Sequence, residues 1–509
     1  MAQIMVIRVL QLIAVFLLPL NVLSAQDIER EGKKKIEILH ADLMDSPNQD
    51  EMRRLLGNVQ FRHKGTYMTC DSAHFYPTRN FFESYSSVHI YKGDSLHLYG
   101  EYLLYDSEAE FAYVSDSVKL IDNETILYTD HIDYDMISET ATYTTGGRII
   151  NEDNVLTSQT GIYHTESEIF NFKDSVKLVN PDYTMYSDTL EYNTSTEVAY
   201  FLAPSKVIGD SLYVRCNRGW YDTKNDVSLL LDDAFIDNKK QIVTGDSLYY
   251  ENENGFGTAH HNVTIRDQEE DIIVKGNDSW YYRDPERFMI TDSAQFIQVN
   301  GDDYLYLHAD TLHSATVSDT VMDYRLVRAF YGCRIYSEDI QAKCDSLSYS
   351  FRDSVIHLYH EPVLWSESNQ LFADSMALFT KNQQMDRMEL YNNAFIIEEV
   401  DSSRYNQLKG SNLYGYFLDN ELDKIEIRGN SEKIYFALEE NELIGVDRST
   451  CVNMDILLED GRIKDIYMLE NPEGTLDPPM HKLPSLRRLE NFAWHEAVRP
   501  KNRFDIFRK

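Results

Sequence analysis

The stretch GDSLYY, residues 245–250, recurs in altered form through most of the chain. It returns as CDSAHF at 70–75, as SDTLEY at 187–192 and as CDSLSY at 344–349. We call its second residue the landmark, and seven of the twelve steps between successive landmarks are 29 residues long. A fixed period of this length indicates a repeat architecture instead of a row of separate globular domains. The landmarks are Asp42, Asp71, Glu101, Asp130, Gln159, Asp188, Asn217, Asp246, Asp278, Asp310, Asp345, Asp374 and Asn412.

Each repeat alternates apolar and polar residues in short runs. Apolar side chains occupy the second and fourth positions after the landmark, as Leu190 and Tyr192 do after Asp188. A polar turn, a short apolar run and an alternating run such as Val118-Lys119-Leu120 follow. Alternation with a period of two, built from β-branched and aromatic residues, is typical of half-buried strands. We therefore predict an all-β fold, an elongated repeat array with about three short strands in each repeat.

The fourth position after the landmark is nearly always aromatic. Because side chains alternate across a strand, this position shares a face with the apolar second position. The position directly after the landmark is mostly Ser, Thr, His or Arg and is expected to face solvent. The interior of the array is therefore predicted to be a stack of apolar side chains. Its aromatic members at the fourth position include Phe75, Tyr105, Tyr134, Tyr163, Tyr192, Tyr221, Tyr250, Tyr282 and Tyr349.

Three segments at the start of the array resemble a known family. They are ILHAD at 38–42, LGNVQF at 56–61 and TCDSAHF at 69–75, and the likeness extends over roughly residues 36–440. In this pattern the chain is similar to the OstA-like family, which includes the lipopolysaccharide-transport proteins LptA, LptC and the N-terminal part of LptD. With about 13 landmarks it is longer than a single LptA unit, and it resembles the long OstA-like proteins of Bacteroidetes-type bacteria.

The resemblance implies a twisted β-jellyroll, open along one edge, whose interior carries lipid acyl chains. It implies a non-enzymatic periplasmic bridge that passes lipopolysaccharide or lipooligosaccharide from the inner to the outer membrane. Inner-membrane LptC-like and outer-membrane LptD-like proteins would be its partners, with end-to-end pairing into a homo-oligomer as a further expectation. The nine aromatic residues named above would then bind lipid. An alternative function is a β-helical carbohydrate-binding or carbohydrate-active envelope protein, and a weaker one is a structural spacer of the envelope.

The two ends of the chain differ from the array. Residues 1–25 hold a single charge and an apolar stretch followed by small residues, which is typical of a secretory signal peptide and predicts export to the periplasm. An uncleaved membrane anchor is the alternative. Residues 26–470 form the array, and residues 471–509 form a tail that contains prolines and is basic from His481 onward. We expect the tail either to cap the last repeat or to dock a partner, with one helical face made by Leu483, Leu486, Leu489, Phe492 and Trp494.

The composition and the motifs exclude several classes of function. The chain has 84 acidic and 48 basic side chains, and a net charge of -36 argues against a nucleic-acid binder that relies on a basic surface. No nucleophile elbow, phosphate-binding loop, dinucleotide fingerprint or zinc-protease motif is present, so we expect no enzyme, no cofactor and no metal site. The many Asp-Ser pairs fit turns in which side chains bond to the backbone better than they fit calcium sites.

Three of the five cysteines share one place in the repeat. Cys70, Cys216 and Cys344 each directly precede a landmark, where other repeats have Gly, Ser, Thr or Ala. Residues several repeats apart lie too far from one another for a disulfide bond. We therefore expect buried free thiols in this column, whereas a bond between Cys333 and Cys344 across a hairpin stays open.

Overall fold

The computed structural model describes most of the chain. The predicted signal peptide and the first residues of the basic tail, 481–487, lie outside the described residues. Within the described part the fold has 38 β-strands, two short 3-10 helices and no α-helix, which confirms the predicted all-β class. No helix there is long and apolar enough to cross a membrane. The described ranges are 35–47, 51–93, 96–122, 125–151, 153–269, 271–320, 322–381, 384–418, 421–439, 442–459, 462–478 and 488–508.

The chain divides into two units, and in each of them the strands pair antiparallel with strands close to them in the chain. Unit 1 comprises residues 1–239 and 246–253, and unit 2 comprises residues 240–245 and 254–509. The strands of unit 1 are β1 (Glu37–His40), β2 (Leu43–Asp45), β3 (Arg53–His63), β4 (Thr66–Tyr76), β5 (Phe81–Lys92), β6 (Leu96–Asp106), β7 (Phe111–Asp122), β8 (Thr125–Asp135), β9 (Thr140–Tyr143), β10 (Gly147–Asn151), β11 (Asn154–Ser158), β12 (Thr160–His164), β13 (Ile169–Val179), β14 (Tyr183–Asn193), β15 (Val198–Phe201), β16 (Ser205–Gly209), β17 (Tyr213–Cys216), β18 (Arg218–Asp222) and β19 (Val227–Asp237).

Strand β20 (Gln241–Glu251) contains residues of both units. The elements of unit 2 are β21 (Phe256–Asp267), β22 (Ile272–Arg283), β23 (Glu286–Thr291), β24 (Gln295–Asn300), β25 (Asp303–His308), β26 (Thr311–Ser318), β27 (Asp323–Tyr336), β28 (Ile340–Ser350), β29 (Val355–Tyr359), β30 (Val363–Ser366), β31 (Asn369–Phe372), β32 (Ser375–Lys381), β33 (Gln384–Asp401), β34 (Arg404–Leu418), β35 (Glu421–Glu439), β36 (Glu442–Glu459), β37 (Arg462–Leu469), β38 (Glu473–Asp477), η2 (Glu496–Val498) and η3 (Asp505–Phe507).

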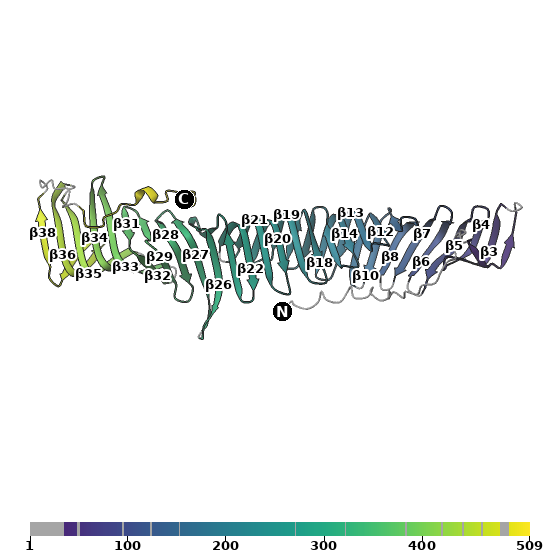
Figure 1. Ribbon diagram of the computed structural model, residues 1–509, viewed down its shortest axis with the longest axis horizontal. Coiled ribbons are helices and arrows are strands. Elements are labelled where there is room, and N and C mark those ends of the chain that lie inside the picture. The colour runs from purple at the N-terminus through teal and green to yellow at the C-terminus, as the bar shows by residue number, and fades with distance from the viewer. Residues whose placement is uncertain are drawn as a thin grey trace, which may run out of the picture. The chain divides into compact units, whose positions relative to one another are not determined.

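Many strands are long and bend near their middle. In unit 1, the neighbouring strands β4, β5 and β6 have 11 or 12 residues each and pair along most of their length (Figure 1). In one strand of a pair, the bend lies at the landmark. In the neighbouring strand, it lies at two extra residues that the pairing skips. Because pairing resumes after the bend, a repeat often consists of two long bent strands instead of the three short strands predicted from the sequence.

Two consecutive residues with left-handed backbone form the bend, and we call them the corner pair. The pairing of β5 with β6 skips Ser86 and Ser87, whose φ angles are 60° and 54°. A landmark donates its backbone N–H to the first residue of a corner pair, as Gln159 does to the carbonyl of Asp174 at 2.9 Å. Gly, Asn and Asp adopt left-handed backbone most readily, which explains the polar turn residues of each repeat. Corner pairs include Gly57-Asn58, Asp116-Ser117, Asp174-Ser175, Asp232-Asp233, His261-Asn262, Asp292-Ser293, Tyr331-Gly332, His360-Glu361, Asn392-Asn393, Gly429-Asn430 and Glu470-Asn471.

The bend gives each repeat two arms with inner and outer faces. Arm 1 contains the strand halves that precede a landmark or follow a corner pair, and arm 2 contains the other halves. In the first repeats of unit 1 the inner faces meet, because Phe61 of arm 1 stacks on Phe82 of arm 2 with ring centroids 4.1 Å apart. Both rings are fully buried in a hydrophobic core that extends from Ile36 to Ile132.

The strand pairing moves one landmark from Asp278 to Asn277. In the other repeats, the residue after the landmark pairs with the residue before a corner pair. In this repeat that residue is Asp278, which pairs with His260. A shift of one residue places the following side chains on the opposite face. The inner-face prediction for Tyr282 is therefore wrong: Tyr282 is 37% exposed, and Tyr281 takes the inner position.

A second landmark moves from Asn412 to Ser411. Tyr391, the last residue before a corner pair, pairs with Asn412, so Asn412 follows the landmark. The structure also contains a later repeat that the sequence comparison missed. Its landmark is Val452, whose backbone N–H donates to the carbonyl of Glu470 at 3.0 Å.

Near the C-terminal end of unit 2, arm 1 has a second hydrophobic core on its outer face. Phe395, Ile397, Ile434 and Phe436 are buried there and alternate along their strands with residues of the inner face. Residues 488–508 of the tail cover this outer core and lie beside β31 and β28 (Figure 1). The described tail thus packs along the side of its own unit.

The tail is an extended segment with two 3-10 turns, so the predicted helical face is not formed by its described part. Leu489 is buried in the outer core, and the ring of Phe492 lies 5.3 Å from that of Tyr405. The ring of Trp494 lies 5.2 Å from the ring of the same tyrosine. Ile506 is also fully buried. Leu483 and Leu486 lie outside the described residues.

Three buried glutamines hold the tail, and each stands four residues before a landmark. Gln407 accepts the backbone N–H of Leu489 at 2.8 Å. Gln370 accepts the N–H of His495 at 2.6 Å and donates to the carbonyl of Ala493 at 2.7 Å. The third, Gln341, accepts from the guanidinium of Arg499 at 2.8 Å. Paired polar groups in a buried contact stabilise it, because an unpaired one would be costly.

Candidate functional site

The inner face of unit 1 is the surface that the sequence singled out, and its first repeats are filled. Phe75 and Tyr105 are 5% and 8% exposed. The hydroxyl of Tyr105 lies 2.6 Å from Nδ1 of His63, and its ring packs on Phe82 at 5.3 Å. These two predicted lipid-binding residues are therefore members of a packed core.

Further along unit 1 the inner face is only partly covered. Tyr134, Tyr163, Tyr192, Tyr221 and Tyr250 lie on this face and are half-buried. The residues nearer the bend, two positions after the landmark, are buried, whereas the tyrosines lie nearer the hairpin turns. Burial therefore decreases from the bend toward the hairpins, and apolar surface stays accessible on arm 2.

Arm 1 contributes apolar residues that the sequence analysis recognised as strand but did not assign to the site. Three positions before their landmarks, Leu127, Leu156 and Val214 are half-buried on the inner face. The third residue after a corner pair, such as Leu178, occupies an equivalent place. The signal was the alternating run of each repeat, whose apolar members repeat with the same period as the aromatic column.

Two tyrosine hydroxyls of this face, those of Tyr192 and Tyr221, are neutral at physiological pH. Burial raises the pKa of Tyr192 to about 12. The pKa of Tyr221 is raised further, first by burial and then by Asp226, whose carboxylate accepts its hydroxyl hydrogen bond at 2.9 Å. Because raised pKa values keep both hydroxyls protonated, these two residues give the surface apolar rings with uncharged polar tips. Such a lining suits hydrocarbon chains better than ions.

The remaining two predicted residues belong to unit 2 and differ from each other. Tyr349 is half-buried four positions after its landmark, as predicted. Tyr282 points outward, and the guanidinium of Arg287 lies 4.3 Å from the centre of its ring. The structure therefore removes Tyr282 from the candidate surface and brings Tyr281 to it.

The five cysteines are buried free thiols. A fourth cysteine, Cys451, also directly precedes a landmark, because the landmark of its repeat is Val452. Burial raises the pKa of Cys216 to about 11 and also raises that of Cys70. Cys333 of β27 and Cys344 of β28 lie directly opposite each other in the strand pairing. This register permits a disulfide bond between them.

We expect the thiols of Cys70, Cys216 and Cys451 to react with iodoacetamide only after unfolding. Thiolate is the reactive form, and a raised pKa together with burial leaves little of it at pH 8. Mass spectrometry of protein alkylated before and after denaturation measures this. Disulfide bonds among these three cysteines would contradict the repeat alignment.

A polar cavity of about 880 Å³ lies along the bends of the last repeats of unit 2. Its lining includes corner-pair residues such as Asn392 and Asn393, together with Glu490 of the tail. These groups bond to one another: Asn393 Nδ2 donates to Asp374 at 3.0 Å. Among the described residues, no group of three or more His, Cys, Asp or Glu side chains is arranged to hold a metal ion.

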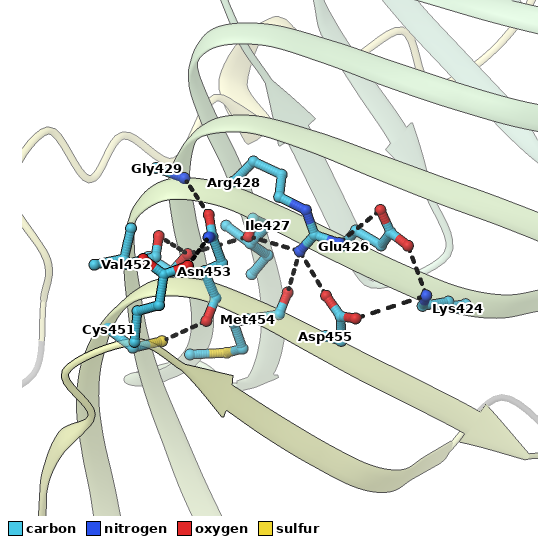
Figure 2. A network of polar contacts seen from close by, with 12 residues as sticks. Lys424, Glu426, Ile427, Arg428, Gly429, Cys451, Val452, Asn453, Met454 and Asp455 are labelled. Carbon is cyan, nitrogen blue, oxygen red and sulfur yellow. Dashed lines mark hydrogen bonds and ion pairs between the residues drawn. The ribbon is translucent and has the colours of Figure 1, made fainter.

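The outer face beside this cavity carries a network of ion pairs, shown in Figure 2. Arg428 bonds to Asp455 at 2.5 Å and to Glu426 at 2.7 Å. At the adjacent bend, the N–H of Gly429 donates to Asn453 at 3.1 Å. Each charge has a partner of opposite sign, which is the arrangement of a solvated structural surface.

Comparison with known families adds to this geometry. Residues 33–188 match the family model described as OstA-like protein. This segment of the chain is similar to the OstA-like family. The sequence resemblance indicated the same family, which is connected with lipopolysaccharide transport and not with catalysis. The OstA-like match includes the packed first repeats and the first half-buried tyrosines, Tyr134 and Tyr163. No curated protein matches the chain.

Proposed function

We propose that this OstA-like protein is a periplasmic lipid carrier that binds lipopolysaccharide or lipooligosaccharide through its acyl chains. The observation that carries the proposal is the half-buried apolar inner face of unit 1, lined from both arms and extending through and beyond the OstA-like segment. In this role the protein bridges the inner and outer membranes, with LptC-like and LptD-like partners at either side. End-to-end association of copies belongs to the same proposal.

The mechanism is burial of hydrocarbon. Each acyl CH₂ kept from water contributes about 0.8 kcal/mol. Because successive repeats present the same column of tyrosines and aliphatic residues, the free energy of a bound chain changes little from one repeat to the next. Directed movement must therefore be driven by a partner. The net charge of -36 gives no general attraction for lipid phosphates, so the acyl chains supply the affinity.

The carbohydrate alternative is less well supported. It was based on a parallel β-helix, whereas the strand pairs described here are antiparallel. The OstA-like match and the antiparallel bent strands together favour the lipid function.

We expect a photo-crosslinking residue at Tyr134 or Tyr192 to capture lipopolysaccharide in cells. Both positions are half-buried on the inner face of unit 1, where an acyl chain would lie within reach. Immunoblotting for a product that contains both protein and lipopolysaccharide measures the capture.

Tyr200 is the matched control for this experiment. It is a tyrosine on the strand next to Tyr192, but it pairs with Glu191 and so faces the opposite side of the sheet. A crosslinker at Tyr200 should capture no lipid. Equal capture at inner and outer positions, or capture at neither, would contradict the proposed function.

A further inference from the structure

The inner face of arm 1 changes from apolar to charged in the last repeat of unit 2. In that repeat, Lys433 is the third residue after the corner pair Gly429-Asn430. The residue three positions before the following landmark is Ser449, whereas the preceding repeat has Leu408 there. After the corner pair Glu470-Asn471 this position is Gly474. After the earlier corner pairs the residues at the position of Lys433 are Phe61, Ile90, Leu120, Leu178, Ile236, Ile265, Phe296, Ile335, Leu364 and Ile396.

Lys433 lies inside the repeat and not on its surface. It pairs with Leu408 on one side and with Ser449 on the other, and its neighbour Ile434 faces the outer core under the tail. The Lys433 side chain is only 5% exposed. Its Nζ lies 2.6 Å from Oδ2 of Asp447, and the hydroxyl of Ser449 donates to Oδ1 of the same carboxylate at 2.6 Å.

This ion pair makes the interior unsuitable for hydrocarbon. A buried pair is tolerated only while both charges keep their partners and hydrogen bonds. The carboxylate of Asp447 is still partly exposed and therefore hydrated. An acyl chain laid against it would remove that water and offer no hydrogen bond in return. At the same position after the earlier corner pairs, an aliphatic or aromatic side chain imposes no such penalty.

We propose that Lys433, Asp447 and Ser449 form a polar stop that ends the acyl-binding surface of unit 2 before its last repeat. The inference rests on the proposed function and defines where the bound lipid must leave. Acyl chains cannot pass over the C-terminal edge of the unit through its interior. They leave on the hairpin side of the bent strands, opposite the bends.

The test uses the full-length chain with a photo-crosslinking residue at Tyr349 or at Tyr435, and purified lipopolysaccharide as the probe. Both tyrosines are half-buried in unit 2, and Tyr435 lies on the inner face opposite Asp447. Because the desolvation penalty of an ion pair amounts to several kcal/mol, we expect labelling at Tyr435 to be at least about tenfold weaker than at Tyr349.

The double variant Lys433→Ile/Asp447→Leu should bring labelling at Tyr435 close to that at Tyr349. Replacing both members of a buried pair by apolar residues preserves folding, whereas Asp447→Leu alone would leave Lys433 unpaired. The control is Lys409→Ile/Glu432→Leu, which removes an ion pair of 3.0 Å from the outer face of β34 and β35. This control should leave labelling at Tyr435 low.

The outcomes separate the two proposals. Strong labelling at Tyr349 with weak labelling at Tyr435, reversed only by the inner double variant, supports the stop. Equal labelling at both positions in the unaltered protein overturns the stop and leaves the proposed function standing. Absence of labelling at both positions in every variant overturns both.

Discussion

Deleting residues 488–508 should lower the stability of unit 2 and cause the chain to self-associate. The deletion uncovers Phe395, Ile397, Ile434 and Phe436, and each fully buried side chain of this kind is worth about 1.5–3 kcal/mol. An exposed apolar patch on a sheet face is also a site of association. Thermal unfolding and size-exclusion chromatography measure the two effects. Unchanged unfolding and an unchanged elution volume would contradict the role assigned to the tail.

A single substitution tests the same contact with less disturbance. Gln370→Leu removes the partners of His495 N–H and of the Ala493 carbonyl, and each unpaired buried group costs about 1–3 kcal/mol. Gln384→Leu is the matched control, since Gln384 is an exposed glutamine of the same unit. Its effect should stay within about 0.5 kcal/mol. Equal effects of the two substitutions would show that the tail is not held through Gln370.

The fold was largely predictable because its information is local. A period of 29 residues and alternation within each strand specify an all-β repeat array whose strands have faces of different polarity, and no distant contact is needed to see this. The aromatic residues at the fourth position after the landmark predicted the inner tyrosines of unit 1, such as Tyr134 and Tyr192. The same pattern could not show that Phe75 and Tyr105 are packed tightly, because packing depends on how closely the two arms approach.

The tail contact was not predictable from the local pattern. Residues 488–508 contact strands more than eighty positions earlier, and neither segment has a periodicity that points to the other. The signal was the glutamine four residues before three landmarks. Gln407 fits this four-residue spacing only if the landmark of its repeat is Ser411 and not Asn412. The strand register was needed to identify Ser411 as that landmark.

The polar stop was also hidden in the sequence. Lys433 reads as an ordinary charged residue of an alternating strand until the corner pair Gly429-Asn430 is located. Counting from that pair places the lysine in a column that is otherwise apolar. Thus the residue types were visible from the start, whereas their faces depended on knowing where each strand bends.

The register shift at Asn277 predicts opposite results for two adjacent tyrosines. In the repeat alignment Tyr282 is inside, but the strand pairing puts Tyr281 there, between the buried Gly257 and the half-buried Phe288. Both are tyrosines within the same segment, so local composition cannot decide between them. A one-residue shift reverses the face of each side chain, and a substitution by aspartate reports that face directly.

We expect Tyr281→Asp to destabilise unit 2 by about 2–4 kcal/mol, because it removes an aromatic ring from the inner face and places a carboxylate there. Tyr282→Asp should cost only about 0.5–1 kcal/mol, the worth of the exposed contact with Arg287. Urea unfolding of the two variants measures the difference. The reverse order would restore Asp278 as the landmark and would return Tyr282 to the inner face. The expected order would instead show that the bend, located by its corner pair, decides which side chains can meet a lipid.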